Sequence, residues 1–234
     1  MRFDVMTLFP NVISTYFNES IIGRALKKEL LYIHCHNIRE YADNKHNRVD
    51  DTPYGGGMGM VMQAEPIYNC YNHIKELTGD KPYTIYMSPK GTVLTQKKSI
   101  ELSKMENIVI LCGHYEGVDQ RILDLIVDEE ISIGDYVLTG GEIPAMALVD
   151  SIVRLLPDVL AGNECFELES HYNGLLEHPQ YTKPRIFEGM EVPEVLLSGN
   201  HKLIDEWRYN NSLEITKNQR FDLYNEYKKK NNTK

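Results

Sequence analysis

Apolar, β-prone runs alternate with stretches of helical periodicity up to about residue 160. The strand-like runs cover 3–9, 31–38, 83–88, 108–113 and 132–138. Helical patterns cover 12–30, 96–105 and 118–130, and a further helix begins near Pro144 and runs through Arg154. Strands that alternate with helices of this length are typical of an α/β domain with a mainly parallel sheet.

The pattern changes after residue 160. Residues 161–187 are polar with scattered Gly and Pro, and a structureless stretch of this length is usually functional or a linker. The remainder has a helical pattern, with Ser198 and Asn200 as candidate N-caps. The sequence therefore predicts an α/β domain over 1–160, a linker over 161–187 and a small helical domain over 188–234.

Composition narrows the class of protein. Hydrophobic residues make up 42% and charged residues 25%, as in soluble globular proteins. No apolar run is long enough to span a bilayer and no signal peptide is recognisable, so we expect a cytoplasmic protein with no membrane partner. A net charge of −9 means that any nucleic-acid partner requires a local basic patch. The widely spaced Cys35, Cys70, Cys112 and Cys165 favour reduced, mostly buried thiols.

Three glycine-bearing turns follow predicted strands, at 86–91 (YMSPKG), 111–117 (LCGHYEG) and 135–142 (DYVLTGGE). None has the dinucleotide fingerprint or the P-loop spacing. Glu116, Asp135 and Glu142 outnumber Lys90 and would repel a polyphosphate. A positively charged nucleoside without phosphates suits the turns better, and S-adenosylmethionine fits that description. Glycine turns after strands are also common for structural reasons, so the pattern alone leaves both interpretations open.

The segments CGHYEGVDQR, SIGDYVLTGGE-PA, YGGGMGM and SGNH---DEWR closely resemble bacterial tRNA (guanine37-N1)-methyltransferases of the SPOUT class. The resemblance extends from the LFP at 8–10 to Arg208. It implies a deep trefoil knot with S-adenosylmethionine bent inside it, and a homodimer whose active site is shared between subunits. The implied reaction moves a methyl group to N1 of guanine 37 in tRNA, next to the anticodon.

The resemblance also implies which residues bind the cofactor. They are Tyr86, Ser88, Pro89, Gly113, Tyr115, Gly117, Ile133, Gly134, Asp135, Tyr136, Val137, Leu138, Gly140 and Gly141. Ordinary strand core is the alternative explanation for Ile133 and Leu138. For Gly141 we expect a positive φ, which a β-branched side chain would not tolerate.

Methylation of guanine N1 requires a base near N1 and a cation or donor near O6. The resemblance assigns the base to Glu169, where the family usually has Asp, and the O6 contact to Arg154. Glu116 matches a carboxylate near the methyl group, with Mg²⁺ as a candidate ion there. The structural alternatives are a solvated loop charge for Glu169 and a helix C-terminal cation for Arg154.

Segments similar to the Gly-rich loop 49–60 help the family to hold tRNA, which implicates Asp50, Tyr54 and Gly59. The motif near the C-terminus implicates Asn200, His201 and Arg208. Lys202 and 228–230 are basic too, but a charge run is more often a solvated face.

Three features leave alternatives open. His34 and His36 alternate onto one strand face but lack a third ligand nearby, so we expect no protein metal site. His114 stands where the family carries Arg, with no consequence that the sequence defines. The rival functions are a related knotted enzyme with another RNA target, and a non-catalytic RNA-binding relative, for which the Glu at position 169 is the only indication.

Overall fold

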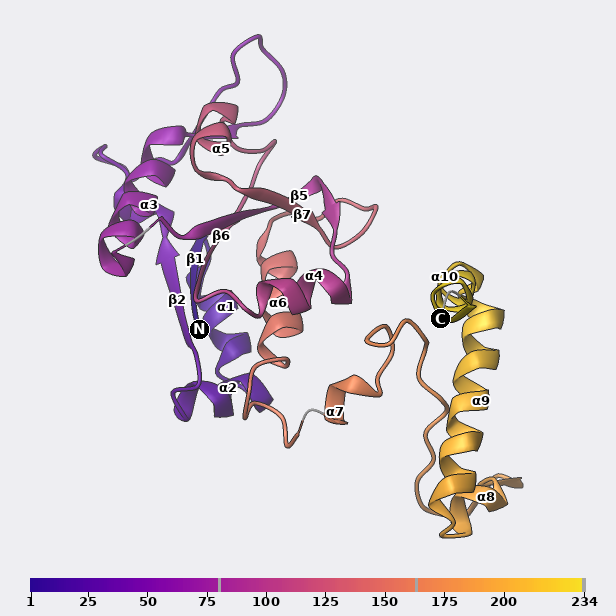
Figure 1. Cartoon of the computed structure of the whole chain (residues 1–234). Coiled ribbons are helices and arrows are strands. Elements are labelled where there is room, and N and C mark those ends of the chain that lie inside the picture. The colour runs from indigo at the N-terminus through magenta and orange to yellow at the C-terminus, as the bar shows by residue number, and fades with distance from the viewer. Residues whose placement is uncertain (80, 163, 233–234) are drawn as a thin grey trace. The chain divides into compact units, whose positions relative to one another are not determined.

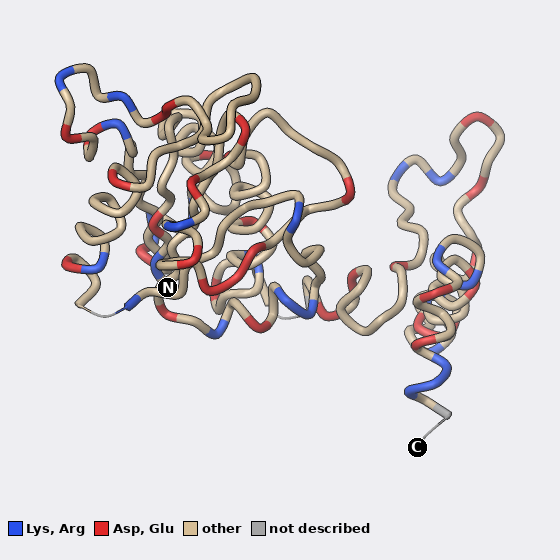
Figure 2. Tube along the Cα trace, turned by 90° about the horizontal axis from the view of Figure 1, so that it is seen from above, with Lys and Arg blue, Asp and Glu red and all other residues tan. Residues whose placement is uncertain are grey.

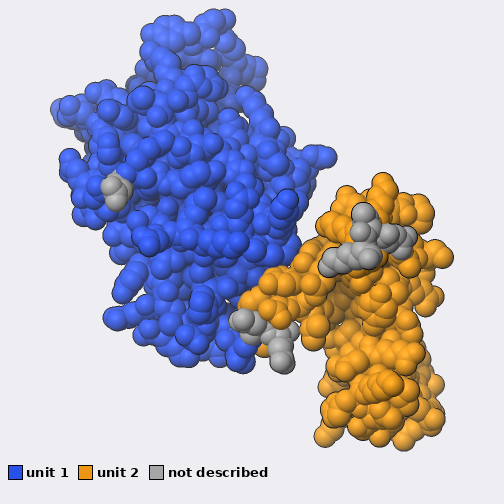
Figure 3. Space-filling view, in the orientation of Figure 1, with its two compact units in different colours: residues 1–162 blue, residues 163–234 orange. Residues whose placement is uncertain are grey.

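The protein is seen in a computed structural model that describes residues 1–79, 81–162 and 164–232. Two compact units divide the chain, Met1–Gly162 and Asn163–Lys234, and Figure 3 colours them separately. The first unit contains the α/β region. The second contains the polar stretch from residue 164 onward together with the C-terminal helices.

A five-stranded parallel sheet forms the centre of the first unit (Figure 1). Its strands are β1 (Arg2–Thr7), β2 (Tyr32–Asn37), β5 (Tyr83–Val93), β6 (Asn107–Cys112) and β7 (Glu129–Ser132), in the order β2-β1-β6-β5-β7. Strand β6 is buried from Ile108 to Cys112, as expected for a parallel strand covered on both faces. The predicted α/β class with a parallel sheet is confirmed.

Helices cover both faces of this sheet. One face packs against α1 (Pro10–Phe17), α2 (Ser20–Lys27), α4 (Gln96–Leu102) and α6 (Glu142–Val153). The other packs against the 3-10 helix η1 (Ile38–Tyr41), α3 (Ala64–Thr78) and α5 (Gln120–Ile126). Each layer buries its own apolar cluster, so the sheet is held rigidly between two cores.

A short antiparallel pair brings the Gly-rich loop back toward the sheet. Strands β3 (Asp50–Asp51) and β4 (Val61–Met62) flank the loop. Met62 then forms a parallel bridge with Val118, and the Glu116 amide donates to the Met60 carbonyl at 3.0 Å. The end of the loop therefore lies beside the segment that follows β6, and its start pairs with that end.

Several sequence expectations about elements need correction. The single helix predicted over 12–30 is two helices, and α3 was not predicted. The helix predicted over 118–130 ends at Ile126, and Glu129–Ser132 forms strand β7 instead. The strand predicted over 132–138 is wrong, because β7 ends at Ser132 and 133–141 is irregular. Strand β5 continues past the first glycine turn, because Met87 and Thr92 both pair with Ile131 and residues 88–91 loop out between them.

The second unit has short elements followed by two long helices. They are α7 (Glu164–Glu167), β8 (Ile186–Phe187), β9 (Met190–Glu191), α8 (Glu194–Leu197), α9 (His201–Gln219) and α10 (Phe221–Asn232). The predicted N-cap is confirmed at Asn200, whose side chain accepts from the Leu203 amide at 3.3 Å. Figure 2 shows that acidic and basic residues are interspersed along both units.

Nowhere in the described ranges does a helix combine the length and the apolar character needed to cross a membrane.

Candidate active site

A cavity of about 330 Å³ lies at the carboxyl ends of β6 and β7 and beside residues 86–90 of β5. These three strands are neighbours in the sheet, so the segments that follow them, and the loop within β5, meet at one edge. Most of the residues predicted to bind the cofactor line this cavity: Tyr86, Ser88, Pro89, Gly113, Tyr115, Gly117, Ile133, Gly134, Tyr136, Val137, Leu138, Gly140 and Gly141. Asp135 is exposed and is not among the lining residues.

The cavity wall carries more acidic than basic side chains. Glu116 and Glu130 line it, and Lys90 has the one ammonium group among the described lining residues. Burial, together with the nearby Glu130 carboxylate, raises the pKa of Tyr86 to about 12, so its phenol stays protonated as a hydrogen-bond donor. This wall suits a neutral or cationic nucleoside better than a polyphosphate.

A buried carboxylate lies where the segment after β6 meets the start of α6. Glu142 is 7% exposed. One of its oxygens is 2.7 Å from Nε2 of His114, and the other accepts from the Thr7 hydroxyl at 2.6 Å. Contacts of this length on a buried carboxylate hold both partners in fixed positions. The end of β1, the segment after β6 and the first turn of α6 are therefore linked.

Gly141 is glycine for a reason other than the one predicted. Its φ is −83°, so the expected positive φ is wrong. A Cβ at this position would lie 2.7 Å from the Cα of Cys112 and 2.9 Å from the amide nitrogen of Gly113. The Gly141 amide also donates to the Gly113 carbonyl at 2.9 Å. Close backbone packing between two cavity segments, rather than backbone conformation, excludes a side chain.

The Gly-rich loop lies against a cavity residue. A Cβ on Gly59 would lie 2.5 Å from Cγ of Glu116, and the φ of Gly59 is +90°. Tyr54 is 99% exposed, and Asp50 lies in β3, half-buried. The structure thus brings the predicted substrate residue Gly59 next to the predicted catalytic residue Glu116, at the edge of the cavity.

Two predicted catalytic residues lie elsewhere. Arg154 caps the C-terminal end of α6, whereas Gly141 and Pro144 at the start of the helix line the cavity. Twelve helical residues separate the two ends by about 18 Å. Glu169 belongs to the second unit, where it lines a cavity of about 790 Å³ together with Arg208. Asn200 and His201 lie at the start of α9 and do not line that cavity.

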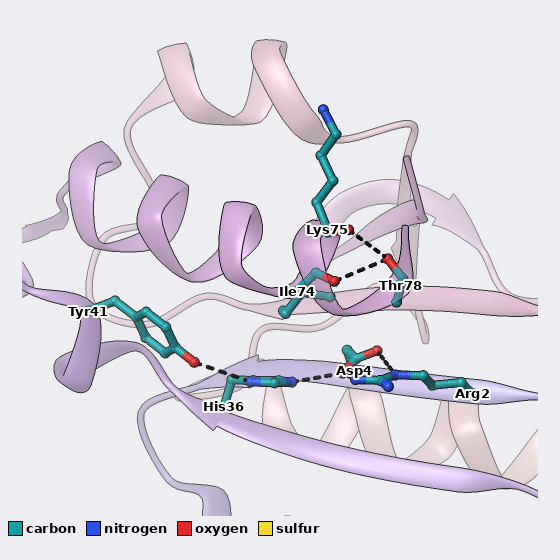
Figure 4. A network of polar contacts seen from close by, with 7 residues as sticks. All are labelled: Arg2, Asp4, His36, Tyr41, Ile74, Lys75 and Thr78. Atoms are coloured by element: carbon teal, nitrogen blue, oxygen red, sulfur yellow. Dashed lines mark hydrogen bonds and ion pairs between the residues drawn. The ribbon is translucent and has the colours of Figure 1, made fainter. Parts of the chain in front are cut away.

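The two histidines of β2 have different surroundings. His34 is exposed, and Nε2 of His36 contacts the buried Asp4 at 2.7 Å (Figure 4). Throughout the described part of the chain, no group of three or more His, Cys, Asp or Glu side chains could hold a metal ion. Glu116 therefore has no preformed set of metal ligands around it.

A family model described as tRNA (Guanine-1)-methyltransferase TrmD matches residues 1–226. The chain belongs to this family. Proteins named tRNA (guanine-N(1)-)-methyltransferase from Clostridioides difficile and Ruminiclostridium cellulolyticum are 56% and 55% identical to it. The first alignment covers 100% of both chains, and the second covers 99% of both.

A solved structure agrees. The crystal structure of tRNA (m1G37) methyltransferase from Aquifex aeolicus is 44% identical, with a TM-score of 0.78 over 94% of this chain and 93% of that chain. Family and fold together identify the chain as a tRNA methyltransferase of the SPOUT class. The resemblance found in the sequence is confirmed.

Sequence reasoning missed several lining residues, among them Glu130, Ser132 and Thr139. Glu130 lies in β7 and pairs with Tyr86 on β5, but the sequence pattern assigned it to a helix and so gave no sign of its place at the cavity. Thr7 carries no local signal either. Its contact with Glu142 spans 135 positions and depends on the packing of α6 against the end of β1.

Proposed function

We propose that this chain transfers the methyl group of S-adenosylmethionine to N1 of guanine 37 in tRNA. Identity over the full chain with proteins named tRNA (guanine-N(1)-)-methyltransferase supports the reaction, and the A. aeolicus relative is described as an m1G37 enzyme. One observation carries the proposal. Three glycine-bearing segments converge on a single cavity whose charges suit a cationic nucleoside.

The cavity residues fit S-adenosylmethionine. The volume of about 330 Å³ is within the usual range for small-molecule sites, and the close approach of Gly141 to Gly113 leaves backbone groups at the wall. When bound, S-adenosylmethionine supplies a methyl group on a positively charged sulfur. The carboxylates of Glu116 and Glu130 favour that charge, and segments 113–117 and 133–141 hold the adenosine.

The remaining chemistry belongs to side chains. Removal of the proton from N1 builds negative charge toward O6, so a base and a cation are both required. Glu169 accepts the proton, and the guanidinium of Arg154 stabilises O6. The cavity that Glu169 shares with Arg208 supports this assignment, because it groups the base with a residue proposed to contact tRNA.

The distance along α6 supports a homodimer with shared active sites. Arg154 lies at the end of the helix remote from its own cavity, so a second copy supplies the Arg154 of each site. Apolar side chains on and near α1 and α6 are exposed: Phe9, Val12, Tyr16, Val137 and Ile143. A second copy of the chain would bury these side chains, which favours association.

The tRNA contacts and the knot complete the proposal. Asp50, Tyr54 and Gly59 contact the tRNA beside the cavity, and Asn200, His201 and Arg208 contact it from the second unit. Family membership implies the trefoil knot around the cavity, and a tRNA substrate implies a cytoplasmic location. Glu116 acts here through its own carboxylate, and no cluster of three or more His, Cys, Asp or Glu side chains that could hold a metal ion occurs among the described residues.

The test is direct. The purified chain is incubated with S-adenosylmethionine and an unmodified tRNA transcript that has guanosine at position 37, and the digested RNA is searched for 1-methylguanosine. A transcript with adenosine at position 37 is the matched control.

A further inference from the structure

The His114 imidazole lies between separate segments around the cavity. Its ring makes an edge contact with Phe9 at 5.0 Å between centroids, and its Nε2 is 2.7 Å from Glu142. A Cβ on Gly140 would lie 2.3 Å from Cε1 of the ring, so the glycine loop packs directly on the imidazole. The His114 amide meanwhile contacts the sulfur of Met62 at 3.2 Å. His114 thus touches β4, the segment after β1 and the glycine loop.

Glu142 depends on this imidazole. The carboxylate is buried in the first turn of α6, where the helix dipole favours a negative charge. Its oxygens contact the Thr7 hydroxyl and the imidazole. Loss of one donor to a buried carboxylate costs far more than loss of an exposed contact, because water cannot replace the donor. Without His114 the first turn of α6 would shift, and the glycine loop that precedes it would shift as well.

We propose that His114 and Glu142 are positioning residues for the cofactor. Their contact sets the separation between segments 113–117 and 139–141, the two walls that the adenosine of S-adenosylmethionine would enter. The inference rests on the proposed function for the identity of the ligand. A cavity that is held open in advance binds with less loss of conformational freedom, so the pair acts on affinity rather than on the methyl-transfer step.

A matched control exists in the same unit. His36 and Asp4 form a contact of the same chemistry and length, 2.7 Å, with an aspartate that is 1% exposed (Figure 4). This contact belongs to a network that also includes Arg2 and Tyr41, and none of its four residues lines the cavity. Substitution of either histidine breaks its contact with a buried carboxylate and should destabilise the fold. Only substitution of His114 should also weaken cofactor binding.

The experiment measures S-adenosylmethionine binding by calorimetry and methyl transfer to tRNA at saturating cofactor. His114→Phe keeps an aromatic ring but removes the donor. His114→Gln places an amide N–H near the position of Nε2. We expect His114→Phe to raise the Kd by about 10- to 100-fold, a change that matches the usual contribution of a hydrogen bond to a charged group. His114→Gln should recover most of the affinity. The kcat at saturating cofactor should change by less than about threefold in both.

Three results separate the explanations. Weaker binding by His114→Phe, rescue by His114→Gln and unchanged binding by His36→Phe support the inference. Unchanged binding by a folded His114→Phe overturns it, as does equal weakening by His36→Phe, which would make the pair purely structural. If His114→Phe does not fold, Thr7→Val removes the other donor to Glu142 and must weaken binding for the inference to stand. A wild-type chain that does not bind S-adenosylmethionine overturns the proposed function itself.

Discussion

Glu142, whose carboxylate contacts the cavity residue His114, and Arg154 lie at opposite ends of α6, about 18 Å apart. A rigid helix of 12 residues cannot bring both to the same reacting atoms. Either Arg154 has no part in the chemistry, or the Arg154 of a second copy completes each site.

Subunit complementation tests this relationship. Glu116→Ala damages the cavity, and Arg154→Ala removes the guanidinium from the far end of α6. We expect each variant alone to lose at least about 10²-fold in methyl transfer. After the two are mixed and allowed to exchange subunits, mixed dimers contain one site with an intact cavity and an intact arginine, so activity should return.

The control is a mixture in which one chain carries both substitutions and its partner is Arg154→Ala, because no intact site can form. Activity that stays at the level of the separate variants after proven exchange would contradict a shared site.

Gly141→Ala should lower the free energy of unfolding by about 1–3 kcal/mol, because a Cβ overpacks the backbone of Cys112 and Gly113. S-adenosylmethionine binding should weaken as well, since segment 139–141 must move to relieve the contact. Urea unfolding and calorimetry measure the two effects. Gly162→Ala is the control, because a Cβ at Gly162 meets nothing within 4 Å. Equal stability of the two variants would refute the packing argument.

The Asp4 network predicts how stability depends on pH. Burial opposes ionisation of Asp4, but hydrogen bonds from His36 and Arg2 outweigh it and lower the pKa of the carboxyl group. A lowered folded pKa gives stability that is present above the unfolded pKa of about 3.9 and is lost as the pH falls through the folded pKa. Asp4→Asn should therefore cost about 1–3 kcal/mol near neutral pH and less near pH 3.

Urea unfolding at the two pH values measures this difference. Glu101→Gln, which loses an exposed ion pair with Lys98 on α4, should show little change at either pH. A penalty for Asp4→Asn that persists undiminished in acid would show that the ionised carboxylate is not the source of the stability.

The sequence predicted the α/β fold because apolar, β-prone runs and stretches of helical periodicity can be recognised along the chain without knowledge of how they pack. It placed three glycine turns after strands whose carboxyl ends meet at one edge of a parallel sheet, and the family resemblance assigned all three turns to one cofactor site. It failed over 133–141, where Ile133, Val137 and Leu138 are apolar yet line a cavity instead of continuing a strand. It could not locate Thr7 against Glu142 or separate Arg154 from the cavity, because both depend on how α6 packs.

Glu169→Gln keeps the size of the side chain but cannot accept a proton, so the single-turnover rate should fall by about 10²–10⁴-fold. Cofactor and tRNA affinities should change little, because the lost interaction acts in the transition state. Glu169→Asp should retain more activity than Glu169→Gln, although a displacement near 1 Å costs on the order of 10²-fold. If Glu169→Gln is as active as wild type, Glu116 becomes the first candidate for the base.

The most direct measurement is the identity and position of the methylated nucleoside. Wild-type chain is incubated with S-adenosylmethionine and an unmodified tRNA transcript, and mass spectrometry of digested fragments locates the product. The account predicts 1-methylguanosine at position 37 and none in the transcript with adenosine there. Methylation at another nucleotide would indicate a different RNA target. A chain that binds S-adenosylmethionine and tRNA but leaves guanine 37 unmethylated would contradict the proposed reaction.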